Sequence, residues 1–263
     1  MVIPLVDMHC HLVAGADDGP PTLDDAVEMC RISREEGVGT IHGLAHQNEY
    51  YPDVTPEVIR EGIRALTARL KEEQIPVMVY PGAEIIVLPA LDADWERGEL
   101  LSVADRQQYV LVEMPHGLFV DIRDLVYRLS QLGLRTLLAH PEQVPELLHD
   151  DGLIEELIGL GCVTVVSTGN VVQPASALDG RRLRAWFRRG IVHLLGSDGH
   201  SPKRRPPLMA QAFRTVVNWA GEAAANRIGA LNGLAVLQGL PLKLPPIERR
   251  RALSWLPRFW ANA

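Results

Sequence analysis

The feature that most constrains the fold of this chain is a regular alternation of short apolar runs with helix-like segments. It repeats seven times, and the apolar runs lack the polar–apolar alternation of a half-exposed strand. Continuous apolar strands are typical of a parallel sheet that is covered on both faces. The predicted strands occupy residues 2–6, 38–45, 77–83, 109–112, 136–139, 162–167 and 191–197. We therefore expect an α/β barrel, for which 263 residues are an ordinary length.

Helix-start signals lie between the predicted strands. Thr22 is a candidate N-cap with acidic Asp24 and Asp25 behind it, and Thr55 is another, followed by Pro56 at the first helical position. Further helices are expected at residues 88–96, 121–132, 145–160 (a pair), 175–189, 207–219, 221–228 and 231–239. Together the strands and helices predict one barrel domain over residues 1–240.

The last part of the chain, residues 241–263, is predicted to be a separate Pro- and Arg/Trp-rich tail. A Pro-rich stretch ends at Pro246, and a basic cluster precedes Trp255, Phe259 and Trp260. Such a segment could contact a membrane surface or a partner. We favour a tail that packs its aromatic side chains on the barrel or on another subunit, and the sequence leaves oligomerisation open.

Composition narrows the class of protein. No apolar run reaches the roughly 18 residues of a membrane span, and the N-terminus does not resemble a signal peptide. Cys10, Cys30 and Cys162 are odd in number and far apart, which argues against a disulfide framework and predicts a cytoplasmic location. The net charge of −7 gives no indication of a nucleic-acid partner.

Side chains that can bind a metal follow every predicted strand but one. They are Asp7, His9 and His11, then His46, Glu84, Glu113, His140, and finally Asp198 with His200. The exception is the strand at 162–167, which runs into Thr168-Gly169-Asn170. The C-terminal ends of barrel strands share one face, where enzymes of this architecture hold their chemistry. Six strand ends with His, Asp or Glu at a common mouth therefore predict a multi-metal hydrolase.

The chemistry of these residue types supports a metal site. His9 and His11 are two apart on a strand and face the same side, whereas Cys10 should point away and serve as packing. Imidazole suits zinc, iron or manganese, and carboxylates favour harder ions. Glu84 and Glu113 end strands in apolar surroundings, where an unpaired carboxylate would be costly, so a cation is their natural partner.

Other polar residues have simpler readings. Asp17-Asp18-Gly19 is typical of a turn, although a carboxylate in this loop could also reach the metal site. His42 and His193 lie inside predicted strands and are interpreted as histidines of the core or of the surroundings of the metals. His149 is interpreted as a surface residue.

In chain order, these motifs resemble those of the PHP (polymerase and histidinol phosphatase) superfamily. They are Asp-x-His-x-His at 7–11, Asp17-Asp18-Gly19, the strand-terminal His46, Gly82-x-Glu84, Glu113, Ala139-His140-Pro141-Glu142 and Ser197-Asp198-Gly199-His200. With Arg205-Pro206-Pro207, the set looks most like the bacterial protein-tyrosine phosphatase branch, which is associated with capsule and exopolysaccharide synthesis. The resemblance covers about residues 3 to 240.

The resemblance implies a distorted seven-stranded (β/α) barrel of the TIM-like PHP type. It implies two or three divalent metal ions, manganese, iron or zinc, with manganese favoured by the family. The resemblance also implies the ligands of each metal. The first metal would be bound by His9, His11, Glu84 and Asp198, and Glu84 would bridge it to a second metal that Glu113 and His140 also bind. The third metal would be bound by Asp18, His46 and His200. The implied reaction is attack of a metal-bound hydroxide on a phosphomonoester. The implied partner is a phosphotyrosine protein, such as a bacterial tyrosine kinase.

One departure from the family pattern concerns the phosphate. The branch usually has an Arg three residues after the fifth-strand His, where this chain has Gln143. A Gln donates hydrogen bonds but lacks the charge and the bidentate fork of Arg. Arg205 matches the other phosphate-binding Arg, so we expect Arg205 and Gln143 to contact the phosphate together with the metals.

Protein phosphotyrosine is therefore the leading substrate, with three alternatives. The first is a PHP phosphoesterase that acts on a small phosphorylated metabolite, histidinol-phosphate-like or a nucleotide. The second is an amidohydrolase-type barrel, which also begins with His-x-His but continues with a bridging Lys; Glu84, Glu113 and Asp198-x-His200 fit PHP better. The third is a metal-binding regulator without activity, which the intact set of nine ligand candidates disfavours.

Overall fold

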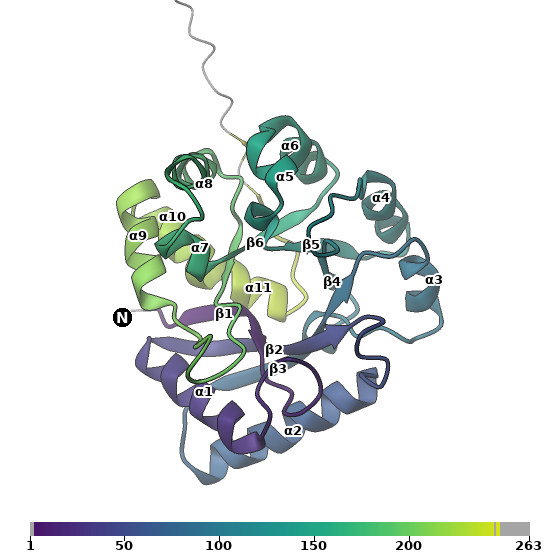
Figure 1. Cartoon of the computed structure of the whole chain (residues 1–263), viewed down its shortest axis with the longest axis vertical. Helices are drawn as coiled ribbons and strands as arrows, with labels where there is room; N and C mark the ends of the chain where they lie inside the picture. Colours follow the sequence, from purple (N-terminus) through teal and green to yellow (C-terminus); the bar gives the residue numbers. More distant parts are fainter. Residues whose placement is uncertain (1–2, 245, 248–263) are drawn as a thin grey trace, which may run out of the picture.

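The centre of the molecule is a seven-stranded parallel sheet whose strands follow one another in chain order. The computed structural model describes residues 3–244 and 246–247. The first and last strands meet through backbone bonds: His11 N donates to Gly199 O at 2.9 Å, and Asp198 N donates to His9 O at 2.8 Å. Because these bonds join its two edges, the sheet forms a nearly closed barrel with helices around it (Figure 1). This confirms the predicted fold class.

The strands are β1 (Leu5–His11), β2 (Val38–Gln47), β3 (Met78–Ile86), β4 (Tyr109–Glu113), β5 (Arg135–Ala139), β6 (Val163–Ser167) and β7 (Leu194–Gly196). The α-helices are α1 (Leu23–Glu35), α2 (Pro56–Glu72), α3 (Leu91–Glu96), α4 (Arg123–Gln131), α5 (Pro145–His149), α6 (Asp151–Gly159), α7 (Thr168–Val172), α8 (Ala177–Arg189), α9 (Ala210–Ala220), α10 (Glu222–Asn226) and α11 (Asn232–Leu237). Three short helices of other types complete the described chain: η1 (Val103–Asp105), η2 (Pro141–Gln143) and η3 (Arg227–Leu231).

Two helices begin where their capping residues predict. Thr22 Oγ1 accepts a hydrogen bond from Asp25 N at 3.2 Å, and Thr55 Oγ1 accepts one from Val58 N at 3.3 Å. Each bond satisfies a backbone N–H that the first turn of a helix leaves without a partner. The helix starts are therefore local features of the sequence.

Two strands at the metal-ligand motifs are longer than predicted, and one is shorter: β7 covers only Leu194–Gly196, where a strand over residues 191–197 was expected. The first strand was expected to end at residue 6, but β1 continues to His11, and β3 continues past Glu84 to Ile86. In β1 the strand continues past its first polar residue, Asp7. Asp7, His9 and His11 are buried inside the barrel, where they have polar partners. The short helix α7 was not predicted; it starts directly after β6 and has no side-chain cap.

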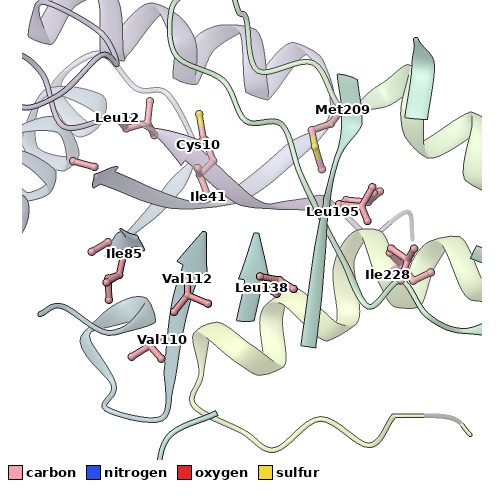
Figure 2. Close-up of a cluster of buried hydrophobic side chains, with 14 of the residues drawn as sticks. Cys10, Leu12, Ile41, Ile85, Val110, Val112, Leu138, Leu195, Met209 and Ile228 are labelled. Atoms are coloured by element: carbon pink, nitrogen blue, oxygen red, sulfur yellow. The ribbon is translucent and has the colours of Figure 1, made fainter. Parts of the chain in front are cut away.

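The core has two parts. The larger cluster packs the barrel strands against the surrounding helices, and it includes Cys10, as expected from its place between His9 and His11 (Figure 2). The smaller cluster joins the starts of several strands to α11, which lies across the end of the barrel opposite the metal-ligand motifs (Figure 1). One end of the barrel is thus sealed by apolar packing, and the other remains available for polar groups.

Two expectations about membranes concern different parts of the chain. None of the helices in the described residues combines the length and the apolar character that crossing a membrane would require. The basic and aromatic part of the predicted tail, at 248–263, lies outside the described residues.

Candidate metal centre

The nine residues predicted as metal ligands gather at one end of the barrel. Three groups have ligand atoms that all lie within 4.8 Å of one another: His11, Asp18, His46 and His200; His9, His11 and Glu84; and His46, Glu84 and Glu113. The groups share members, so they form one continuous cluster. The remaining two residues, His140 and Asp198, join it through Glu84 and His9.

Glu84 lies at the centre of this cluster and is buried. Its Oε2 is 3.1 Å from His9 Nε2 and 3.2 Å from His11 Nε2, and its Oε1 is 3.0 Å from His140 Nε2. Burial raises the pKa of the Glu84 carboxyl, but the positive field of His9 and the hydrogen bonds from His11 and His140 outweigh it. The pKa therefore lies well below its ordinary value, and the carboxylate can face two metal positions.

Glu113, at the end of β4, extends the cluster on one side. Its Oε1 is 3.0 Å from His46 Nδ1, and its Oε2 is 3.9 Å from His140 Nε2. On the other side, Asp18 Oδ1 is 3.5 Å from both His46 Nε2 and His200 Nε2. These acids thus connect histidines that belong to different strands.

Asp198 completes the cluster beside β1. Its Oδ1 is 3.6 Å from His9 Nε2 and 3.7 Å from His200 Nδ1. Two of the ligand candidates, Asp198 and His140, have left-handed backbones with φ of 55° and 33°. A left-handed backbone costs a residue other than glycine about 1–3 kcal/mol, so the surrounding structure must hold both turns in place. At the ends of β5 and β7, the left-handed turns direct both side chains into the cluster.

Asp17 was expected to form a turn or to reach the metals, and the structure assigns it to the turn and to the support of two histidines. Its Oδ2 lies 2.7 Å from His11 Nδ1 and accepts the backbone N–H of His46 at 2.9 Å, while its Oδ1 accepts the N–H of Gly19. A hydrogen bond at Nδ1 leaves Nε2 of His11 free to face the centre. The Asp17-Asp18 pair was the only sequence signal, and it could not tell which carboxylate takes which role.

Asp7 and Tyr51 also support the site. The sequence placed Asp7 among the side chains that can bind a metal, and it gave Tyr51 no role. Asp7 Oδ1 accepts the N–H of His9 at 3.1 Å and of Ser197 at 2.8 Å, so it ties β1 to the end of β7. Burial raises the pKa of Asp7 to about 6 against these hydrogen bonds. The ring of Tyr51 stacks on that of His46 at 5.7 Å and 5°. Tyr51 follows Tyr50 in a loop, where no periodicity could have singled it out.

The residues fit a divalent metal on the evidence of their own atoms. His11 Nε2 and His46 Nδ1 are buried and face carboxylate oxygens, at 3.2 Å from Glu84 Oε2 and 3.0 Å from Glu113 Oε1. Burial lowers the pKa of His11 and His140, but hydrogen bonds to the carboxylates of Asp17 and Glu84 raise that of His11 to about 10, and the bond to Glu84 raises that of His140 to about 9. The cluster therefore attracts positive charge, and imidazole and carboxylate are the donors that first-row divalent ions take.

The two residues predicted to contact phosphate lie on different sides of the cluster. Arg205 Nη2 is 2.7 Å from Asp198 Oδ2, and the guanidinium is half-exposed at the mouth. Gln143 Nε2 donates to Ser167 Oγ at 3.5 Å, on the side of β5 and β6. Arg205 thus touches a ligand candidate directly, whereas Gln143 is held beside the end of β6.

Three other histidines lie outside the cluster, as expected. His42 is buried, with Nδ1 at 3.2 Å from Met8 O, and His193 accepts a hydrogen bond from Thr164 N at 3.0 Å. Burial lowers the pKa of each to about 4. His149 lies at the surface in an ion pair with Asp179.

Comparison with known proteins places this geometry among phosphatases. A family model for capsular polysaccharide synthesis proteins of the CpsB/CapC type matches residues 5–238. The tyrosine-protein phosphatase YwqE of Bacillus subtilis is 30% identical over 206 residues, which cover 76% of this chain and 79% of the relative. The tyrosine-protein phosphatase CpsB of Streptococcus pneumoniae is 28% identical over 231 residues, which cover 85% and 94%.

A solved structure gives the same result in three dimensions. It comes from work that describes YwqE from Bacillus subtilis and CpsB from Streptococcus pneumoniae as unique metal-dependent tyrosine phosphatases. It is similar to this chain with a TM-score of 0.84 and 26% identity, and it covers 94% of this chain and 100% of that chain.

Proposed function

This chain belongs to the CpsB/CapC family of capsular polysaccharide synthesis, and from that premise we propose that it is a metal-dependent phosphatase whose substrate is phosphotyrosine in protein. The observation that carries the proposal is the contact of buried Glu84 with three histidines from β1 and β5. One carboxylate with histidines on both oxygens is suited to bridge two cations.

We assign the ligands in three sets, of which the first two share Glu84. The first set is His9, His11, Glu84 and Asp198; the second is Glu84, Glu113 and His140; the third is Asp18, His46 and His200. Two or three ions of manganese, iron or zinc are proposed, with manganese favoured by the family. When bound, such ions lower the pKa of water and neutralise the charge of phosphoryl oxygens.

The protein's own residues would bind and orient the phosphate. Arg205 offers a charged guanidinium fork at the mouth. Its Nη2 pairs with the carboxylate of Asp198, and the guanidinium is half-exposed. Gln143 offers a neutral donor from the opposite side. Asp17 keeps Nε2 of His11 directed at the centre. Arg205 therefore supplies most of the attraction for the phosphate, and Gln143 contributes a weaker hydrogen bond.

The thiols are not placed to act as nucleophiles. Cys10, Cys30 and Cys162 are buried and free, and burial raises the pKa of each. A thiolate is the reactive form of cysteine, so a raised pKa keeps these groups inert. Free, buried thiols also suit the reducing cytoplasm, where we propose that the protein meets its substrate, such as a tyrosine kinase that carries phosphotyrosine.

The test is a phosphatase panel on metal-reconstituted protein. It compares peptides that carry phosphotyrosine, phosphoserine or phosphothreonine with a phosphodiester, histidinol phosphate, nucleotides and sugar phosphates. We expect the largest kcat/KM on phosphotyrosine and loss of turnover after chelation. A clear preference for one small metabolite would replace protein phosphotyrosine with the metabolite alternative.

A further inference from the structure

A second cavity opens beside the metal centre, between the turn after β5 and the helices that follow β6. It has a volume of about 350 Å³ and is lined by Glu142, Gln143 and Asn170 together with residues of α5 and α8. Gln143 N donates to His140 O at 2.9 Å, so cavity and cluster share one turn of backbone. The Cα atoms of His140 and Gln143 can be no more than about 11 Å apart. The cavity therefore lies at the same end of the barrel as the cluster, beside the ends of β5 and β6.

The base of this cavity holds an acid with one oxygen free. Glu142 is 6% exposed. Its Oε1 accepts hydrogen bonds from Ser167 N and Asn170 Nδ2, both at 2.9 Å. Its Oε2 is buried and has no hydrogen-bond partner in the described part of the chain. A buried carboxylate oxygen without a donor is costly, so a rotation of the carboxylate that brings this atom to the cavity and to a donor of the ligand would be favourable.

The rest of the cavity suits a long side chain with a positive end. Part of the wall is apolar and consists of Pro145, Leu148 and Leu183. A second acid in the lining is Asp179, whose Oδ1 is 2.9 Å from His149 Nε2. Among the described residues that line the cavity there is no Lys or Arg. Arg and Lys bury an aliphatic stem along apolar surface and direct a charged head to a carboxylate.

We propose that this cavity is a substrate subsite that takes an arginine or lysine side chain of the phosphotyrosine protein, with its charged head at the carboxylate of Glu142. The inference rests on the proposed function, because it assigns a flanking residue of the same substrate. An extended peptide advances about 3.3 Å per residue, so the cation lies roughly two to four residues from the phosphotyrosine.

Gln143 has a specific role in this arrangement. An Arg at this position would place a fixed positive charge on the wall of the cavity next to Glu142 and would repel a substrate cation. A neutral Gln leaves the acid available. The same residue that weakens the hold on phosphate therefore makes the cavity selective for a basic neighbour.

The experiment uses the full-length, metal-loaded protein and synthetic phosphotyrosine peptides. Arginine is placed at each of four positions on either side of the phosphotyrosine and compared with citrulline, its neutral isostere, at the same position. At one or two positions we expect kcat/KM to be about tenfold higher with arginine, as a charge-assisted hydrogen bond to a buried acid predicts. Equal rates for both peptides at every position overturn the inference.

Variants locate the effect. In Glu142→Gln, the side-chain oxygen can still accept from Ser167 and Asn170 while the free oxygen is replaced by a donor, so the arginine-to-citrulline ratio should fall to about one. Gln143→Arg should abolish the ratio as well. If Glu142→Gln does not fold, a second variant, Ala175→Phe, tests the same point. Its phenyl ring fills the cavity from the exposed edge, so the arginine-to-citrulline ratio should fall there as well. Ala177→Phe, an equally exposed alanine that does not line the cavity, should keep the ratio.

Hydrolysis of 4-nitrophenyl phosphate separates this inference from the proposed function. That small ester reaches the metals but not the cavity. Turnover of this ester and of phosphotyrosine peptides without an arginine preference refutes the subsite and leaves the phosphatase standing. A metal-loaded protein that hydrolyses neither refutes both. A ratio that survives in Glu142→Gln and in Ala175→Phe places the cation elsewhere and overturns the assignment.

Discussion

Two buried histidines, His11 at the mouth of the barrel and His193 at its sealed end, have pKa values displaced in opposite directions. At the mouth, hydrogen bonds with Asp17 and Glu84 overcome burial and raise the pKa of His11 to about 10. At the start of β7, His193 has no acid against it, and burial lowers its pKa to about 4. Burial is common to both, so the carboxylates decide the difference. Clustered acids mark the mouth as the place for cations, whereas a neutral histidine at the far end only packs and accepts a hydrogen bond.

The strongest way to break this contrast is to remove the central acid. Glu84→Gln keeps the shape of the side chain but removes the charge between His9, His11 and His140. We expect kcat/KM to fall by about a thousandfold or more, with loss of bound metal, because a ligand contributes more than the 10–100-fold typical of its hydrogen-bond partners. Metal content by elemental analysis and steady-state kinetics measure it. His193→Asn at the far end should leave both unchanged; bound metal retained in Glu84→Gln would contradict the assignment.

The far end can be tested through the pH dependence of stability. The folded-state pKa of His193, about 4, lies below its ordinary value of 6.5, so protonation favours the unfolded chain. The neutral side chain of His193 therefore contributes fully to the free energy of unfolding above about pH 6.5. This contribution is lost as the pH falls to about 4, which lowers the free energy of unfolding by roughly 3 kcal/mol. In His193→Asn, which retains an acceptor for Thr164 N, this part of the dependence should be absent. Urea unfolding of both proteins from pH 7 to pH 4 measures the difference, and parallel curves would show that His193 does not resist protonation.

The variant Asp17→Asn tests whether Asp17 orients the histidines at the mouth. This change removes the charge that faces His11 Nδ1 while retaining one oxygen for the N–H of His46 or Gly19. We expect a loss of about 10–100-fold in metal affinity or activity, as for other groups that orient a metal-binding histidine. Asp24→Asn, the same substitution on an exposed acid of α1, is the control. Equal metal titrations for the two variants would show that Asp17 serves the turn alone.

A smaller expected effect concerns the two sides of the mouth. Arg205 has charge and lies on Asp198, whereas Gln143 is neutral and lies by Ser167. Arg205→Ala should therefore lower kcat/KM on 4-nitrophenyl phosphate more than Gln143→Ala. Gln143→Arg should raise kcat/KM by about tenfold, roughly 1.4 kcal/mol of transition-state binding. Steady-state kinetics on the three variants decide it, and the reverse order of the two alanine variants would show that Gln143 is the main phosphate contact.

The reaction type is tested by the thiol that lies between two ligands. Cys10 is buried in the larger core cluster, and burial raises the pKa of its thiol well above the ordinary value. Cys10→Ser should keep metal-dependent turnover, since a nucleophile other than the thiolate attacks phosphorus. Loss of turnover at unchanged metal content would show that the proposed reaction is wrong.

The sequence predicted the architecture well because its signals are local or periodic. Apolar runs and caps such as Thr22 and Thr55 depend on neighbouring residues, so the seven strands and the first helices are found near their expected places. Strand ends were less predictable. β1 runs through Asp7, His9 and His11, because backbone bonds to the end of β7, 190 residues away, continue the pairing past the polar residues.

The ligand candidates were predictable for a related reason. Parallel strands that end in His, Asp or Glu must place those side chains at one edge of the sheet, so nine residues could be named from order alone. The structure brings all nine together, and their roles as ligands stay a prediction. The separate roles of Asp17 and Asp18 were beyond the sequence, because neighbouring acids in a turn differ only in the direction that the loop gives them.

The sequence by itself determined the barrel, the order of its strands and the residue types at its mouth, because these follow from local hydrogen bonding and from the period of apolar residues. Only the tertiary structure decided which groups carry charge. The pKa of His11 and that of His193 move in opposite directions because of acids that are distant in sequence, and the free oxygen of Glu142 depends on donors from β6 and α7. Electrostatic energies depend on distance in space and on burial, which exist only once the barrel has closed.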